Sequence, residues 1–134
     1  MEFSIGRRRP DLTLAIEGRD DAPRQARRSV LRFLDDPDDP IADSVTLVVS
    51  ELVANVVIHA HGIGRLDLWD PKPGVPLRVE VSDLVHTVPT PRHAADTDTS
   101  GRGLNIVRQL ADTWGIEPTP DGKTIWAEFS RLGL

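Results

Sequence analysis

Glu51 and Asn55 are the first residues whose types and spacing suit chemistry. They lie four residues apart in a segment that is otherwise rich in valine and leucine. Four residues make about one helical turn, so both side chains would share one helix face. A carboxylate can act as a general base, and a carboxamide oxygen is a suitable Mg²⁺ ligand. A solvated helix edge would explain one Glu, but a Glu–Asn pair on so apolar a helix indicates a pocket or a partner.

Asp83 is the second candidate. It follows the alternating segment Val79-Glu80-Val81 and stands where a long loop begins. Strand ends that face a crevice are common ligand positions. Aspartate also forms turns, so its position alone leaves both interpretations open.

The third motif is Ser100-Gly101-Arg102-Gly103-Leu104, in which two glycines open a predicted helix. Backbone N–H groups at a helix N-terminus bind anions, and glycine lets a phosphate approach closely. A G-x-G pair is weak evidence by itself. The chain contains no G-x-x-x-x-G-K-[ST], which excludes a P-loop. A dinucleotide fold is disfavoured because both the third glycine and the βαβ order are missing.

The apolar pattern predicts the elements that position these motifs. Six valines within residues 41–60 suit a strand, but the polar residues of this segment recur three to five apart, as on one stripe of a helix. We expect strands at residues 12–16, 65–70, 75–82, 114–117 and 123–130, and helices up to about residue 34, over 41–60 and over about 102–113, the last capped by Ser100. This order predicts an α/β (α+β) two-layer sandwich, with a mixed, mostly antiparallel sheet and helices on one face.

Length and composition narrow the function further. The 134 residues fit one domain, residues 1–134, with a flexible tail at 1–10 and a loop at 84–100. The chain has no cysteine, which excludes disulfides and thiolate metal sites. Residues 33–134 carry eight basic and sixteen acidic side chains, which argues against nucleic-acid binding. Because we find no apolar run of membrane-spanning length and no signal peptide, we expect a cytoplasmic protein.

Four histidines raise the question of a metal site: His59, His61, His86 and His93. His59 and His61 are two residues apart and cannot share a helix face. No acidic residue completes a familiar zinc spacing, so we do not expect zinc.

Taken together, the motifs resemble the ATP-binding family shared by gyrase B, histidine kinases and MutL, with its Bergerat ATP-binding fold, and in particular the stand-alone anti-sigma-factor serine/threonine kinases. The resemblance covers nearly the whole chain, in the family's order and spacing. The matching segments are Glu51-Leu52-Val53-Ala54-Asn55 with His59-Ala60, Val81-Ser82-Asp83, Gly101-Arg102-Gly103-Leu104, and Gly122-Lys123-Thr124-Ile125-Trp126.

The resemblance implies a role for each site residue. Asn55 would help to hold Mg²⁺, Asp83 would receive the adenine amino group of ATP, and Thr124 would support Asp83. Glu51 would activate the hydroxyl of a protein serine or threonine, and residues 84–100 would form the ATP lid. The phosphates would be lined by Gly101, Arg102, Gly103 and Leu104.

By the same resemblance, the function is that of a Mg-ATP-binding regulatory protein, a serine/threonine kinase acting on an anti-sigma antagonist. Its partners would be a sigma factor, the antagonist or both, and a second copy of the chain is possible; nucleic acid and membrane are not expected. One departure favours an alternative. The family often has Gly-x-Gly after the aspartate, whereas Leu84-Val85-His86 follows Asp83 here. The alternatives are a non-catalytic, nucleotide-gated module that sequesters a partner, and a domain whose nucleotide site has decayed.

Overall fold

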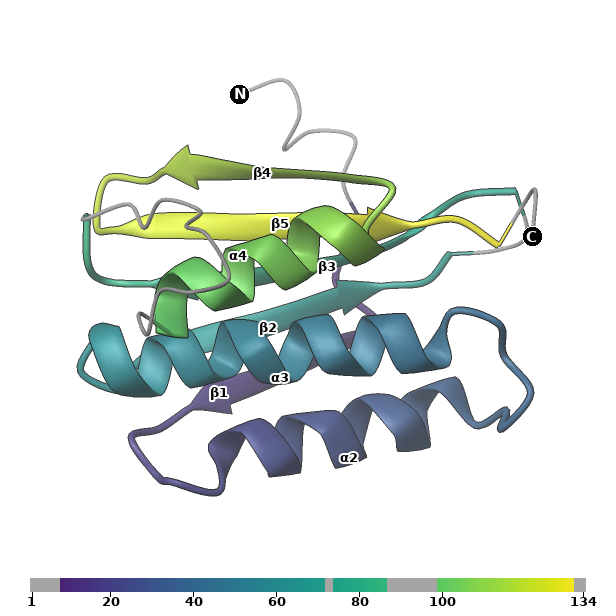
Figure 1. Cartoon of the computed structure of the whole chain (residues 1–134), viewed down its shortest axis with the longest axis horizontal. Coiled ribbons are helices and arrows are strands. Elements are labelled where there is room, and N and C mark those ends of the chain that lie inside the picture. Colours follow the sequence, from purple (N-terminus) through teal and green to yellow (C-terminus); the bar gives the residue numbers. More distant parts are fainter. Residues whose placement is uncertain (1–7, 72–73, 87–98, 132–134) are drawn as a thin grey trace.

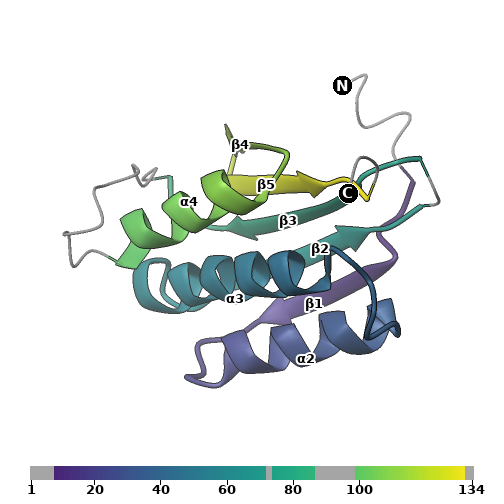
Figure 2. The same ribbon diagram turned by 45° about the vertical axis from the view of Figure 1, so that its right-hand side comes forward.

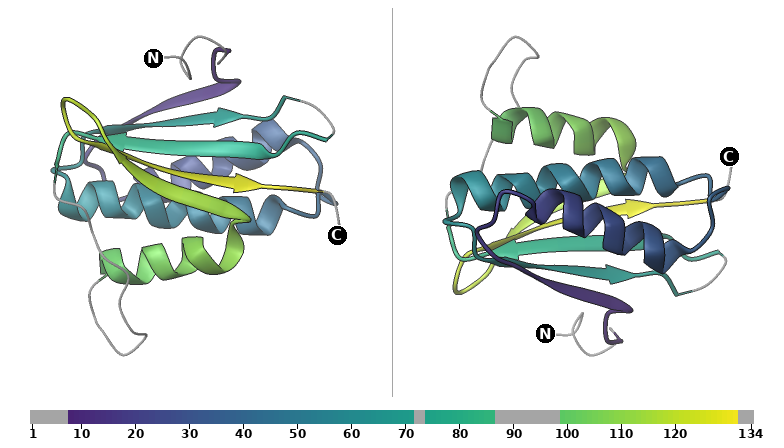
Figure 3. Two further views of the ribbon diagram at one scale, coloured as in Figure 1. Left: turned by 90° about the horizontal axis from the view of Figure 1, so that it is seen from above. Right: turned by 90° about the horizontal axis from the view of Figure 1, so that it is seen from below.

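A computed structural model describes residues 8–71, 74–86 and 99–131. Its five strands form one sheet in the order β1-β2-β3-β5-β4. The strands are β1 (Leu12–Ile16), β2 (Gly64–Trp69), β3 (Leu77–Asp83), β4 (Thr113–Pro118) and β5 (Lys123–Phe129), and the helices are α2 (Ala22–Leu34), α3 (Ala42–His59) and α4 (Thr99–Leu110). The helices form one layer on one face of the sheet (Figures 1 and 3), which confirms the α+β two-layer sandwich.

The sheet differs from the prediction in one respect. Each strand pairing in the described residues is antiparallel, so the sheet is not mixed. The reason is the connection between β3 and β5. Helix α4 and strand β4 return the chain across the sheet, and β5 therefore runs back beside β3 in the opposite direction (Figure 1).

Helix α3 is the central element of the core. It lies between α2 and α4 (Figures 1 and 2), and its valines pack on the inward side chains of the strands. By length and composition this helix could cross a membrane, so the prediction that the chain has no apolar run of that length is wrong. Half of the helix is buried within the domain, as in a core helix of a soluble protein. Its fully buried residues include Val45, Val48, Val49, Leu52 and Val53.

Helix α4 begins and ends about three residues earlier than predicted, at Thr99 and Leu110. Ser100 therefore lies inside the helix and is not its cap. The end is set by the sheet, because Asp112 N already donates to Glu128 O and starts the pairing of β4 with β5. The predicted inward residues Leu104 and Val107 are fully buried. Most of the predicted lid, residues 87–98, and most of the predicted tail, residues 1–7, lie outside the described residues.

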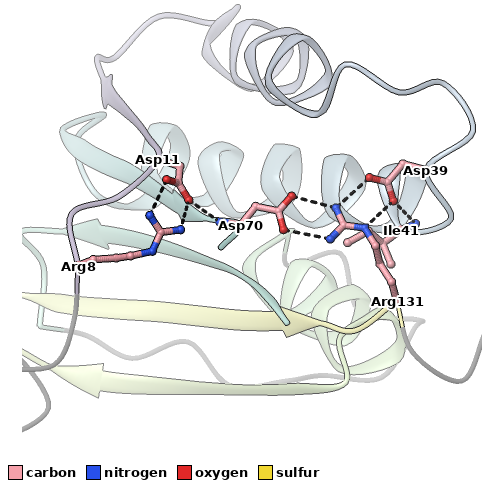
Figure 4. Close-up of polar contacts among 6 residues, drawn as sticks. All are labelled: Arg8, Asp11, Asp39, Ile41, Asp70 and Arg131. Carbon is pink, nitrogen blue, oxygen red and sulfur yellow. Dashed lines mark hydrogen bonds and ion pairs between the residues drawn. The ribbon is translucent and has the colours of Figure 1, made fainter. Parts of the chain in front are cut away.

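Arg131 fastens the end of the sheet to two loops (Figure 4). Its guanidinium donates to both carboxylate oxygens of Asp39 and of Asp70, at 2.9–3.1 Å. Asp39 Oδ1 also accepts from Ile41 N at the start of α3. The hydrogen bonds with Arg131 hold the pKa of Asp39 below its ordinary value, and those with Asp39 and Asp70 raise the pKa of Arg131.

Candidate functional site

The topology brings the predicted site motifs to one end of the domain. The C-terminal end of α3, the end of β3, the start of β5 and the start of α4 all lie on the left in Figure 1. Residues 51–55, 83, 101–104 and 124 therefore come from elements that meet at the same end, although they are spread over more than half of the chain.

Asn55 carries the clearest sign of a ligand. Its side chain belongs to the buried part of α3, with 8% of the residue exposed, and its Nδ2 atom is buried without a hydrogen-bond partner among the described residues. Leaving a buried amide unpaired costs about 1–3 kcal/mol, so such a group calls for an explanation. Rotation of the carboxamide exchanges its nitrogen and oxygen, so the same position can present an oxygen to a cation. The residue therefore fits the predicted role at a Mg²⁺–nucleotide site.

Glu51 lies one turn before Asn55 on the same helix and is half-buried. Within the part of the chain that the structure describes, it makes no hydrogen bond or ion pair. Most of α3 is apolar, and Ser50 and Asn55 are the polar residues nearest to Glu51 along the helix. A carboxylate in this position is able to accept a proton from a hydroxyl group placed beside it.

Asp83 is held by an unexpected partner, Lys123. Lys123 Nζ lies 2.9 Å from Asp83 Oδ2 and 3.1 Å from Oδ1, and it also donates to Val85 O at 3.1 Å. Asp83 Oδ1 accepts a further hydrogen bond from Val85 N at 2.9 Å. The two charged side chains are only 8% and 7% exposed, so the ion pair is buried.

The structure places the side chain of Thr124 beside Ser82 and not beside Asp83. In the register of β3 and β5, Thr124 pairs with Ser82, and Lys123 pairs with Asp83. Because successive side chains alternate between the faces of a strand, Thr124 and Asp83 point to opposite faces. Thr124 Oγ1 instead lies 2.8 Å from Ser82 Oγ. Sequence reasoning missed Lys123, although its position in the apolar alternation of β5 (Lys123, Ile125, Ala127) marked it as inward-facing.

A hollow of about 370 Å³ opens beside this end of the sheet. This volume lies within the usual range of small-molecule sites, about 300–1,000 Å³. Two predicted site residues, Asp83 and Thr124, are among those that line the hollow. Its lining residues are Ile63, Gly64, Arg65, Ser82, Asp83, Leu84, Thr119, Asp121 and Thr124.

Gly122 allows the β4–β5 turn to approach the end of β3. A Cβ atom at this position would overlap the carbonyl oxygen of Asp83. Any other residue would push the two backbones apart, so glycine is required by this close approach. The glycine of the predicted Gly-x-Thr motif thereby helps to place Asp83 and Lys123 side by side.

The second glycine motif lies at the N-terminal end of α4. Backbone N–H groups in the first helical turn lack acceptors within the helix, and the helix dipole favours an anion there. Leu104 departs from the prediction in one respect. Its side chain is fully buried in the hydrophobic core.

The histidines form no metal site in the described part of the chain. His59 and His61 are exposed, and the described residues contain no group of three or more metal-ligating side chains. His93 lies outside the described residues.

Comparison with known proteins agrees with the fold and with the motif order. The sequence profile of the histidine kinase-like ATPase domain matches residues 16–129, which is most of the chain. No curated protein is similar enough in sequence to count as a match. The chain therefore belongs to the histidine kinase-like ATPase family, a family of ATP-binding domains.

Proposed function

We propose that this domain binds Mg-ATP and transfers the γ-phosphate to a serine or threonine hydroxyl of an anti-sigma antagonist protein, thereby controlling a sigma factor. One observation carries the proposal. Asn55 is a buried amide whose nitrogen has no partner within the part of the chain that the structure describes, and a half-buried carboxylate, Glu51, lies one turn away on the same helix. The family match supports the ATP-binding part of the proposal.

In this proposal the bound Mg-ATP supplies the phosphoryl group, with the metal offsetting its negative charge. Asn55 offers an oxygen to the metal, and Asp83 accepts a hydrogen bond from the adenine amino group. Glu51 takes the proton of the attacking hydroxyl while the new oxygen–phosphorus bond forms. The bond from the γ-phosphorus to its bridging oxygen breaks, and ADP leaves.

The backbone at the start of α4 contributes the phosphate-binding part. Gly101 lies in the first turn of α4, where free N–H groups and the positive end of the helix dipole favour an anion, and Arg102 and Gly103 follow it directly. Thr124 lines the hollow beside Asp83 and is assigned to the base end of the same site.

A second function is favoured by the segment after Asp83. Leu84 is 59% exposed, and both polar backbone groups of Val85 are bonded to the Asp83–Lys123 pair. A rim of the adenine pocket built from Leu84 and Val85 is bulkier than one built from glycines. This difference favours a module that binds nucleotide and sequesters a partner without phosphate transfer.

One experiment separates the two functions. The purified chain is incubated with Mg²⁺, ATP labelled at the γ-phosphate and candidate antagonist proteins from the same genome. Label appearing on serine or threonine of one antagonist supports the kinase. Stable, nucleotide-dependent binding of a partner that stays unlabelled supports the sequestering module. Absence of any ATP binding contradicts both.

A further inference from the structure

We propose that Lys123 is the positioning residue of the base-reading site, because it fixes Asp83 as a pure hydrogen-bond acceptor that selects a base bearing an exocyclic amino group. The inference deepens the proposed ATP binding at Asp83 and rests on it. It is carried by the buried contact between the two side chains at the ends of β3 and β5.

The ammonium group of Lys123 is enclosed by three oxygen atoms of its neighbours. A lysine ammonium has three protons. Lys123 donates to Asp83 Oδ1 and to the carbonyl oxygen of Val85, and Asp83 Oδ2 lies 2.9 Å from the ammonium in the ion pair. We infer that these contacts engage the ammonium, so that it does not donate to a carbonyl group of a base.

The acceptors in this contact are the two carboxylate oxygens of Asp83. Each carboxylate oxygen has two lone pairs. Asp83 Oδ1 accepts from Val85 N and from Lys123, which uses both of its lone pairs. Asp83 Oδ2 accepts no hydrogen bond from the described residues and contacts Lys123 through the ion pair, so it keeps acceptor capacity for a ligand. The pair thus offers an acceptor at Oδ2.

The group at position 6 of a purine base decides whether the base matches this acceptor. The 6-amino group of adenine is a donor and matches the remaining acceptor, whereas the 6-carbonyl of guanine is an acceptor and does not. A base with hydrogen at position 6 leaves the acceptor unused. Lys123 has a further role, since a buried carboxylate is stabilised by a paired charge, and the contact holds Asp83 in this orientation. The structure therefore assigns the base preference to both residues, with Lys123 acting through Asp83.

The test compares ATP with purine riboside triphosphate, which lacks the amino group, and with GTP. Affinities are measured by calorimetry for the wild type, Lys123→Met, Asp83→Asn and the double variant. The matched control is Lys72→Met, which changes the only other lysine of the chain. We expect the wild type and Lys72→Met to prefer ATP over purine riboside triphosphate by about 10- to 100-fold, the usual worth of a hydrogen bond to a charged group.

Lys123→Met should reduce this preference to a few-fold. In the Asp83→Asn background, Lys123→Met should leave the ratio of the affinities for ATP and purine riboside triphosphate almost unaltered, because Lys123 acts only through the carboxylate of Asp83. A purely structural lysine would weaken both nucleotides equally, so a preference that survives Lys123→Met overturns the inference.

A second measurement does not depend on whether Lys123→Met folds. In a Lys72→Arg protein, Lys123 is the single lysine, and its ¹⁵N-labelled ammonium gives one assignable signal. This signal should shift on binding ATP and stay in place on binding purine riboside triphosphate. A signal that responds equally to both nucleotides contradicts the inference.

The outcomes also separate this inference from the proposed function. A wild-type protein that binds ATP and purine riboside triphosphate equally well retains nucleotide binding but refutes base reading by Asp83 and Lys123. A wild-type protein that binds no nucleotide refutes the proposed function itself.

Discussion

Thr124 and Ser82 face each other across β5 and β3, with their hydroxyl oxygens 2.8 Å apart. One residue along each strand, Lys123 and Asp83 form their ion pair on the opposite face. The end of the sheet therefore presents a neutral hydroxyl pair on one side and a buried charge pair on the other. Ser82, Asp83 and Thr124 are among the residues that line the hollow at this end of β3.

Asp83→Asn should weaken ATP binding by about 10- to 100-fold, since the charge-assisted hydrogen bond to the base is replaced by a neutral one. Calorimetry on the folded variant measures the change. Asp35→Asn is the matched control, because Asp35 is exposed in the loop after α2 and has a left-handed backbone that Asn tolerates. Unchanged ATP affinity in Asp83→Asn would remove Asp83 from the site.

Asn55→Leu should leave the melting temperature unchanged or raise it, because it replaces an unpartnered buried amide by an apolar group of similar size. Mg²⁺-dependent ATP binding should be lost at the same time. Gain of stability with loss of ligand is the signature of a residue kept for function.

The matched control is Asn105→Leu on α4, where the carboxamide oxygen accepts a hydrogen bond from Arg108. This variant should keep the Mg²⁺ response. If Asn55→Leu responds to Mg²⁺ as the wild type does, Asn55 is no metal ligand.

Much of this candidate site was predictable from the sequence, because its signals lie within single helices and strands. Asn55 and Glu51 stand out because the rest of their helix is apolar, and alternation placed Asp83 at a strand end. The fold class followed from the order of elements. The end of α4 was placed three residues late because the pairing of Asp112 with β5, which ends the helix, depends on a contact distant in sequence.

The role of Thr124 could not be predicted in the same way. A shift of one residue in the pairing of two strands moves every side chain to the other face, and the sequence does not fix this register. Lys123 carried a signal that was available but unused. It is a charged residue at an inward position of β5, and Asp83 occupies an inward position at the end of β3. Two opposite charges at inward strand ends predict an ion pair once the strands are known to be neighbours.

Arg131→Met should lower the free energy of unfolding by roughly 1–3 kcal/mol, because Asp39 and Asp70 lose charge-assisted hydrogen bonds in a partly buried setting (Figure 4). Chemical denaturation at neutral pH measures this change in the free energy of unfolding. Arg8→Met is the matched control, since its pair with Asp11 is exposed and should be worth less than about 1 kcal/mol. Equal effects of the two variants would contradict the role assigned to Arg131.

The same contact predicts a pH dependence. The pKa of Asp39 is held below its ordinary value of 3.8, mainly by the hydrogen bonds from Arg131. The folded state therefore binds the proton less readily than the unfolded state. The stabilisation is complete above about pH 3.8 and is lost as the pH falls through the lower, folded pKa. In Arg131→Met, unfolding curves from pH 5 to pH 2 should show a smaller loss of stability, and an identical loss would refute this assignment.

Residues 84–100 are expected to act as an ATP lid. Their low apolar content predicts fast amide exchange without nucleotide and slower exchange once ATP is bound. Hydrogen–deuterium exchange followed by mass spectrometry measures both states. Slow exchange in the free protein that ATP leaves unchanged would identify an ordinary packed loop.

We propose that Glu51 serves as the base of phosphate transfer, and the Glu51→Gln variant tests this role. The amide keeps the size and hydrogen bonding of the side chain but cannot accept the proton. Transfer of labelled phosphate to the antagonist is measured with ATP and partner at saturating concentrations, after calorimetry has confirmed that both still bind. We predict a fall in the transfer rate of about 10²- to 10⁴-fold with binding retained, the usual worth of a positioned base. Transfer at the wild-type rate by the Glu51→Gln protein would contradict the account.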